Sequence, residues 1–154
     1  MIMIPVLILQ IFLFPLSASW LMNTWVNQRR ALALQDAASN IGSTIQQTYF
    51  SLNHVTIPNG TKTSNLFRLP QSIDGYCYVG NAVLFPTSGA QGSAQRLEIT
   101  LRLVNINFAA DTSVVLGSNA RWSQTANFTS TSPDASVCAQ KSSDGTTIEM
   151  HFGG

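Results

Sequence analysis

The chain opens with a long segment in which apolar side chains fall on every side of a helix. Residues 1–28 contain no charged side chain, and from Met1 to Phe14 the only polar side chain is that of Gln10. A helix needs about 20 apolar residues to cross the ~30 Å hydrocarbon core of a bilayer. Because no face of this helix favours water, we expect the segment to lie in lipid or against other protein.

From Arg29 onward the pattern becomes amphipathic. Apolar residues recur at spacings of three and four, while glutamine, serine, asparagine and aspartate occupy the other faces. The apolar stripe consists of Leu34, Ala38, Ile41, Ile45, Tyr49 and Leu52. This period predicts a helix that covers residues 1–54, with an apolar part at 1–28 and an amphipathic part at 29–54. The stripe is expected to pack on a folded domain, and Ala37 and Gly42 permit close approach there.

Residues 55–154 are typical of short strands separated by turns. Apolar and polar residues alternate along 96–104, with Leu97, Ile99, Leu101 and Leu103 facing one side, and Ile148, Met150 and Phe152 repeat the pattern. Other strands are predicted at 65–69, 76–85, 113–116, 120–125 and 136–141, and the last strand covers 146–152. The fold class is therefore α+β, with a long N-terminal hydrophobic helix followed by an antiparallel β-sandwich (Ig-like) head.

Proline interrupts the apolar segment at two positions. Pro5 lies in the first turn, where a helix tolerates proline, but Pro15 removes an internal hydrogen bond. We expect a helix break at Pro15, with the helix kinked or opened between Ile11 and Pro15.

Signals for the cellular compartment conflict with the charge flanking the apolar segment. Arg29 and Arg30 are the only positive residues beside it, which would place the head inside the cell. The sequons at Asn59 and Asn127 predict glycosylation, and with two cysteines they favour the exterior. A cleaved signal ending near Ser17-Ala18-Ser19 is one alternative, although no basic residue precedes the apolar stretch. A basic leader removed before Met1 would resolve the conflict.

The layout of an apolar N-terminus, a helix of about 50 residues that turns amphipathic and a β-rich head resembles a type IV pilin-like subunit. Bacterial type IV pilins usually carry a glutamate at mature position five, where this chain has Pro5, so the chain is most similar to archaeal pilins. The resemblance implies removal of a leader by a prepilin-type peptidase, storage in the membrane and export by an assembly machinery. Identical subunits would then form an extracellular homopolymer.

In that family the apolar helix forms the filament core. The polymerisation residues implied by the resemblance are Ile2, Ile4, Val6, Leu7, Leu9, Phe12, Leu13, Phe14, Trp20 and Leu21. The function implied is that of a structural subunit of an adhesion or attachment pilus. An archaeal flagellar filament subunit shares the layout, and a membrane-anchored binding module that never polymerises is the alternative from another class.

Cys77 and Cys138 are the only cysteines, and each falls in a predicted strand. Outside the cell they could form a disulfide, which would contribute up to ~4 kcal/mol in the chain-entropy model. Two buried free thiols are the alternative. Widely separated cysteines with two histidines lack metal-ligand spacing, so no metal site is expected.

Charge and motifs argue against catalysis and nucleic-acid binding. Eight basic and seven acidic residues give a net charge of +1, which provides no basic patch for a nucleic acid. The sequence contains none of the common hydrolase, zinc-protease, P-loop or dinucleotide motifs. His54 near the expected helix end and His151 on the water face of the last strand are interpreted as structural. The chain is therefore predicted to be no enzyme and to use no cofactor.

Overall fold

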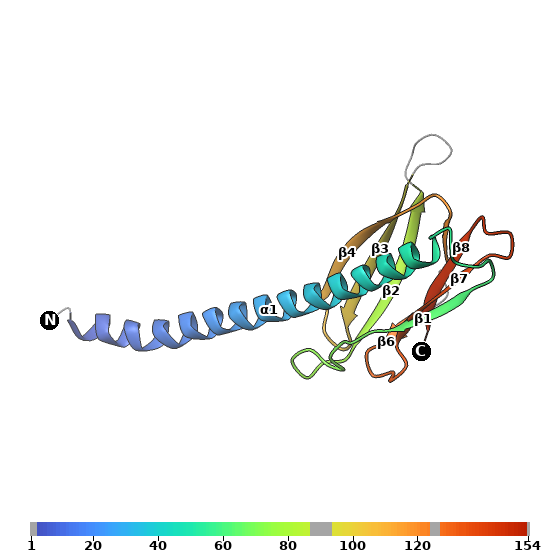
Figure 1. Cartoon of the computed structure of the whole chain (residues 1–154). Coiled ribbons are helices and arrows are strands. Elements are labelled where there is room, and N and C mark those ends of the chain that lie inside the picture. Colours follow the sequence, from blue (N-terminus) through green and yellow to red (C-terminus); the bar gives the residue numbers. More distant parts are fainter. Residues whose placement is uncertain (1–2, 87–93, 124–126, 154) are drawn as a thin grey trace. The chain divides into compact units, whose positions relative to one another are not determined.

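A computed structural model describes residues 3–86, 94–123 and 127–153, and it confirms an α+β fold (Figure 1). One helix precedes eight strands in the described residues. These elements are α1 (Met3–Leu52), β1 (Lys62–Leu66), β2 (Tyr78–Pro86), β3 (Gln95–Leu103), β4 (Ala109–Leu116), β5 (Ala120–Trp122), β6 (Phe128–Thr129), β7 (Ser136–Lys141) and β8 (Ile148–Gly153). The side chains of residues 3–7 and of Phe12 lie outside the description, although their backbone belongs to α1.

The chain divides into two compact units, Met1–Leu32 and Ala33–Gly154. The boundary falls inside α1, so the amphipathic half of the helix belongs to the unit that holds the sheets. Its predicted stripe is buried, since Leu34, Ala38, Ile41 and Ile45 are each 0% exposed. This burial agrees with the predicted apolar stripe, and the helix ends at Leu52, two residues before the predicted end.

The predicted helix break at Pro15 is wrong. The helix α1 continues from Met3 to Leu52 with Pro15 inside it. Proline fixes φ near the helical value, which favours helical geometry, although its missing N–H removes one bond and its ring crowds the carbonyl four residues earlier. At this turn Ser17 Oγ donates a hydrogen bond to the Phe14 carbonyl, at 3.0 Å. The bonds of the neighbouring turns are therefore sufficient to keep the helix continuous.

The strands form two four-stranded sheets, with the orders β1-β7-β8-β5 and β4-β3-β2-β6. Most neighbours are antiparallel, as predicted, but β5 pairs with β8 in parallel through Ala120–Ile148, Arg121–Glu149 and Trp122–Met150. The sheets are thus rich in antiparallel pairs without being purely antiparallel.

Alternation along the strands agrees with the sequence pattern. On β3 the side chains of Leu97, Ile99, Leu101 and Leu103 are buried, and on β8 those of Ile148, Met150 and Phe152 are buried. The opposite face of β3 carries exposed Arg96 and half-buried Glu98, with Arg96 Nη2 and Glu98 Oε2 3.9 Å apart. One face of each strand therefore contributes to the core.

Aromatic side chains from both sheets meet in this core. The rings of Phe128 on β6 and Phe152 on β8 have centroids 5.0 Å apart, and Phe67, which follows β1, lies 5.3 Å from Phe128. Trp122 on β5 packs edge-on against Phe152 at 4.9 Å. Because Phe128 and Phe152 belong to different sheets, their contact joins the two sheets.

The second half of α1 packs against the sheet β4-β3-β2-β6 (Figure 1). A Cβ on Gly42 would lie 2.8 Å from Val114 Cγ1 and 3.6 Å from Ile99 Cδ1, so the helix backbone runs close to β4 and β3. Gln35 Nε2 donates to the Asp111 carbonyl at 3.4 Å, and Gln46 Nε2 to the Val115 carbonyl at 3.2 Å. The helix is thereby attached to β4 by side-chain bonds as well as by apolar packing.

The same helix also contacts β1 of the other sheet. Asn65 Nδ2 donates to Thr48 Oγ1 at 2.6 Å, and Thr48 itself is 0% exposed. Thr48 Oγ1 donates in turn to the Thr44 carbonyl, at 2.7 Å. This chain of bonds satisfies a hydroxyl that would otherwise be buried without a partner.

Candidate assembly surface

The first unit presents large apolar side chains to solvent along its described helical residues. Of the predicted polymerisation residues, Leu9, Leu13, Phe14, Trp20 and Leu21 are all exposed, with Leu9 at 61% and Phe14 at 78%. No other segment of the described chain has such a density of exposed large hydrophobic residues. This surface is the strongest candidate for a functional site.

The remaining predicted polymerisation residues cannot be compared in the same way. Ile2 lies outside the described residues. Ile4, Val6, Leu7 and Phe12 lie on α1, but their side chains are outside the described part of the chain. For these five residues the role in assembly stays a prediction.

The structure adds six residues to this surface that the predicted set omits. They are Ile8, Ile11, Leu16, Met22, Trp25 and Leu32, each more than half exposed. The sequence pattern could have identified most of them. A helix that is apolar on every side exposes Ile8, Ile11 and Leu16 as much as the residues of the predicted set. Leu32 lies beyond the apolar segment assigned to residues 1–28, and its exposure extends the surface past Arg29 and Arg30.

Polar side chains on this helix are partly satisfied by the helix itself. Thr24 Oγ1 donates to the Trp20 carbonyl at 2.9 Å, and Ser17 Oγ donates to the Phe14 carbonyl at 3.0 Å. Such back-bonding lets a hydroxyl lie in apolar surroundings without an unpaired donor. These two residues therefore do little to reduce the apolar character of the surface.

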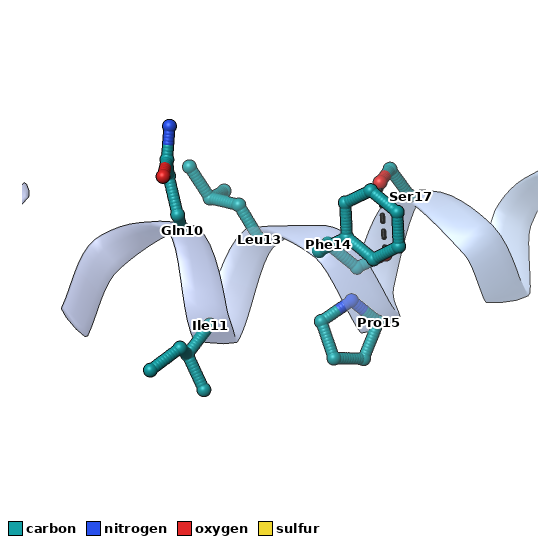
Figure 2. A pocket seen from close by; sticks show the side chains of 6 residues that line it. All are labelled: Gln10, Ile11, Leu13, Phe14, Pro15 and Ser17. Carbon is teal, nitrogen blue, oxygen red and sulfur yellow. Dashed lines mark hydrogen bonds between the residues drawn. The ribbon is translucent and has the colours of Figure 1, made fainter. Parts of the chain in front are cut away.

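The surface is slightly hollowed around Pro15. The depression is open and is lined by Gln10, Ile11, Leu13, Phe14, Pro15 and Ser17. Figure 2 shows Gln10 and Leu13 on one side of the helix and Ile11 and Pro15 on the other. A flat apolar surface with shallow relief suits contact with another helix better than it suits a small molecule.

Within the described residues, no helix combines the length and the hydropathy that crossing a membrane requires.

The predicted disulfide between Cys77 and Cys138 is not formed, and both cysteines are free and partly buried. Cys138 lies on β7, where its Sγ is 3.6 Å from Ser64 Oγ of β1 and 3.9 Å from Ser136 Oγ. Cys77 immediately precedes β2, which belongs to the other sheet. Cys138 therefore lies on a strand of one sheet and Cys77 lies next to a strand of the other, a placement that sequence spacing could not reveal.

Both predicted glycosylation residues are exposed. Asn59 precedes Gly60, whose φ of 80° places it in a turn, and Thr61 Oγ1 donates to the Pro58 carbonyl at 2.7 Å. Asn127 precedes the two-residue strand β6, in which Phe128 is buried and Thr129 is exposed. Exposure of both asparagines, with Thr61 half-buried and Thr129 exposed, is compatible with modification, which stays a prediction.

The two histidines take the positions that the sequence indicated. His54 lies just after the end of α1, where its Nδ1 is 2.8 Å from Thr56 Oγ1. His151 is exposed on β8, opposite Cys138 of β7. In the described part of the chain, no group of three or more histidine, cysteine, aspartate or glutamate side chains is arranged to hold a metal ion.

Comparison with known proteins gives no relative, since no family model, no curated protein and no solved structure matches this chain.

Proposed function

We propose that this chain is a structural subunit of an extracellular helical filament of the archaeal type IV pilus kind, with a role in adhesion or surface attachment. The observation that supports this function is the exposed apolar surface on the first unit, from Ile8 to Leu32. Soluble monomers rarely expose contiguous apolar patches larger than a few hundred Å². Such an apolar surface is expected to be shielded from water by a partner. The proposed partners are identical helices from neighbouring subunits.

Burial of these side chains would supply the free energy of assembly. Each Å² of apolar area removed from water contributes about 25 cal/mol, and full burial of one leucine, isoleucine or phenylalanine contributes about 1.5–3 kcal/mol. Ile8, Leu9, Ile11, Leu13 and Phe14 are all at least half exposed. Contacts that cover them on several sides would therefore stabilise a polymer strongly.

The proposal includes a precursor whose N-terminal segment rests in the membrane before assembly. The apolar residues that would line a filament core are also the residues that acyl chains solvate well. Removal of a leader by a prepilin-type peptidase and transfer by an assembly machinery are part of the same proposal. They follow from the resemblance to archaeal pilins.

The head is proposed to form the outer part of the filament as an Ig-like sandwich without catalytic activity. Its two sheets meet through Phe128 and Phe152, as the layers of a sandwich do. The parallel pairing of β5 with β8 is a departure from the common arrangement. A net charge of +1 and sequons at Asn59 and Asn127 suit a neutral, glycosylated outer surface that binds no nucleic acid.

Electron microscopy of material sheared from the surface of the native cells tests the function. Uniform thin filaments that contain this chain by mass spectrometry would support the proposal, and a motility assay would then separate a pilus from a flagellar filament. Recovery of the chain only with detergent-solubilised membranes would contradict the proposal and favour a non-polymerising anchored binding module.

Substitution of Leu9 or Leu13 by Asp tests the surface directly. Burial of an unpaired carboxylate costs several kcal/mol, so each variant should fail to assemble while the head remains folded. Leu66→Asp is the matched control, because Leu66 on β1 is 62% exposed and Leu9 is 61% exposed. Normal filaments from Leu9→Asp, or loss of filaments from Leu66→Asp alone, would argue against assembly through the helix.

A further inference from the structure

The outward face of the sheet β1-β7-β8-β5 brings a thiol and an imidazole together. Ala139 and Met150 are buried in the core, so Cys138 and His151, one position away along β7 and β8, face outward. The register places Cys138 directly opposite His151. Directly opposed residues of an antiparallel pair have Cβ atoms about 4.5–5.5 Å apart, so the imidazole lies within reach of the sulfur.

Hydroxyl groups border the same sulfur. Ser64 is the register partner of Cys138 on β1, and Cys138 Sγ donates to Ser64 Oγ at 3.6 Å. Ser136 Oγ, on the same strand as the cysteine, lies 3.9 Å from Sγ. A Cβ on Gly153 would lie 2.8 Å from Sγ, so glycine at this position leaves room for the thiol. The half-buried Cys138 therefore has polar neighbours on its own strand and on both adjacent strands.

An open depression lies over this row of residues, where β1, β7 and β8 run side by side (Figure 1). Its volume of about 460 Å³ is within the range of small-molecule sites. The residues that line it include Lys62, Ser64, Cys138, Gln140 and His151. Lys62 and Gln140 are register partners and supply ammonium and amide donors. The depression therefore combines a nucleophile, a group that accepts its proton and donors for an anion.

We propose that Cys138 and His151 form a modification site, at which the Cys138 thiol exchanges with a small disulfide that carries carboxylate groups. The His151 imidazole accepts the thiol proton, and the thiolate attacks one sulfur of the disulfide. A bond forms between Cys138 Sγ and that sulfur, the disulfide bond of the reagent breaks, and its other half leaves as a thiolate that takes up the proton. Lys62 and Gln140 donate hydrogen bonds to a carboxylate of the half that stays. This site is separate from the proposed filament function and does not depend on it.

Exchange of the folded, reduced full chain with glutathione disulfide tests the site. Intact mass and peptide mapping should show an adduct on Cys138 that forms about tenfold faster than any adduct on Cys77, which adjoins a strand of the other sheet. His151→Gln should slow exchange at Cys138 at least about tenfold, because the amide does not accept the proton. His54→Gln is the matched control and should exchange at the wild-type rate. Added imidazole should restore part of the rate in His151→Ala, which a purely structural role of His151 would not allow.

A second variant separates recognition of the carboxylate from the exchange reaction. Lys62→Gln should slow exchange with glutathione disulfide about threefold and leave exchange with the neutral 2-hydroxyethyl disulfide unchanged, whereas His151→Gln should slow both. Equal rates at Cys77 and Cys138, a wild-type rate for His151→Gln, or adducts that form only after unfolding in urea would overturn the site. A Lys62→Gln variant that treats the two reagents alike would overturn the preference for a carboxylate.

Discussion

Gly42 and Val114 determine how closely the helix approaches the sheet. A Cβ built on Gly42 would come within 2.8 Å of Val114 Cγ1, a distance at which one of the two must move. Val114 is buried on β4, so it has little room to do so. Glycine weakens a helix by about 1 kcal/mol relative to alanine, and at this position the close contact offsets that loss.

Gly42→Leu is therefore expected to lower the free energy of unfolding of the head by about 1–3 kcal/mol, the usual effect of overpacking. Urea unfolding followed by circular dichroism measures the change. Gln47→Leu, at an exposed position of the same helix, should change stability by less than about 0.5 kcal/mol. Val114→Ala combined with Gly42→Leu should recover part of the loss, and no recovery would contradict the assigned contact.

Lys141 is expected to stabilise the segment that follows the helix. Its side chain is 8% exposed, and Nζ donates to the carbonyls of Ile57 at 3.0 Å and His54 at 3.3 Å. Lys141→Met removes the donor from both carbonyls and should destabilise the head by about 1–3 kcal/mol in urea unfolding. Lys62→Met, at an exposed position of β1, is the control and should have little effect.

Tyr78 should make the head sensitive to alkaline pH. It is 0% exposed, its Oη donates to the Pro70 carbonyl at 2.7 Å, and burial raises its pKa from 10.0 to about 12. A pKa that is higher in the folded state means that the native protein holds the proton more tightly than the unfolded chain. The stabilisation is therefore complete below pH 10.0 and is lost as pH rises toward about 12.

Unfolding free energies measured across this pH range should decline for the wild type and decline less for Tyr78→Phe. Part of the decline should persist in that variant, because burial also raises the pKa of Tyr49, although a hydrogen bond from the Gly117 backbone lowers it. An identical decline in wild type and Tyr78→Phe would show that Tyr78 does not contribute.

The two cysteines are expected to react as thiols. Alkylation of unreduced, unfolded protein should add two groups to the intact mass, since Cys77 and Cys138 are free. Prior treatment with a reductant should not change that number. If neither residue is labelled without reductant, the result would support the disulfide predicted from the sequence.

Strong periodicity allowed much of the fold to be predicted. Residues 34–52 showed a helical period and residues 96–103 an alternating one, and both patterns follow directly from burial of one face. The first half of β4 was missed because Ala109 to Thr112 have no alternating apolar residues. That half is a strand because it pairs with Leu101 and its neighbours on β3, and such a partner is not visible in local sequence.

Other features depended on contacts between distant residues. The two-residue strand β6 is too short for any periodic signal, and the parallel pairing of β5 with β8 depends on topology. The predicted break at Pro15 overestimated the loss of one N–H donor, because the hydrogen bonds of the neighbouring turns keep α1 continuous. The exposed apolar surface itself was predictable. A helix that is apolar on every side has no face that favours water, and this can be read from the sequence without any knowledge of the fold.

The bonds from Gln35 and Gln46 to β4 have a consequence for how copies of this chain can associate. β4 is an edge strand, and an unoccupied edge invites pairing with a strand of another molecule. The two glutamine amides already engage the carbonyls of Asp111 and Val115. A strand of another molecule would have to displace these two glutamine side chains before it could pair with β4, so the helix protects this edge of the sheet from strand addition.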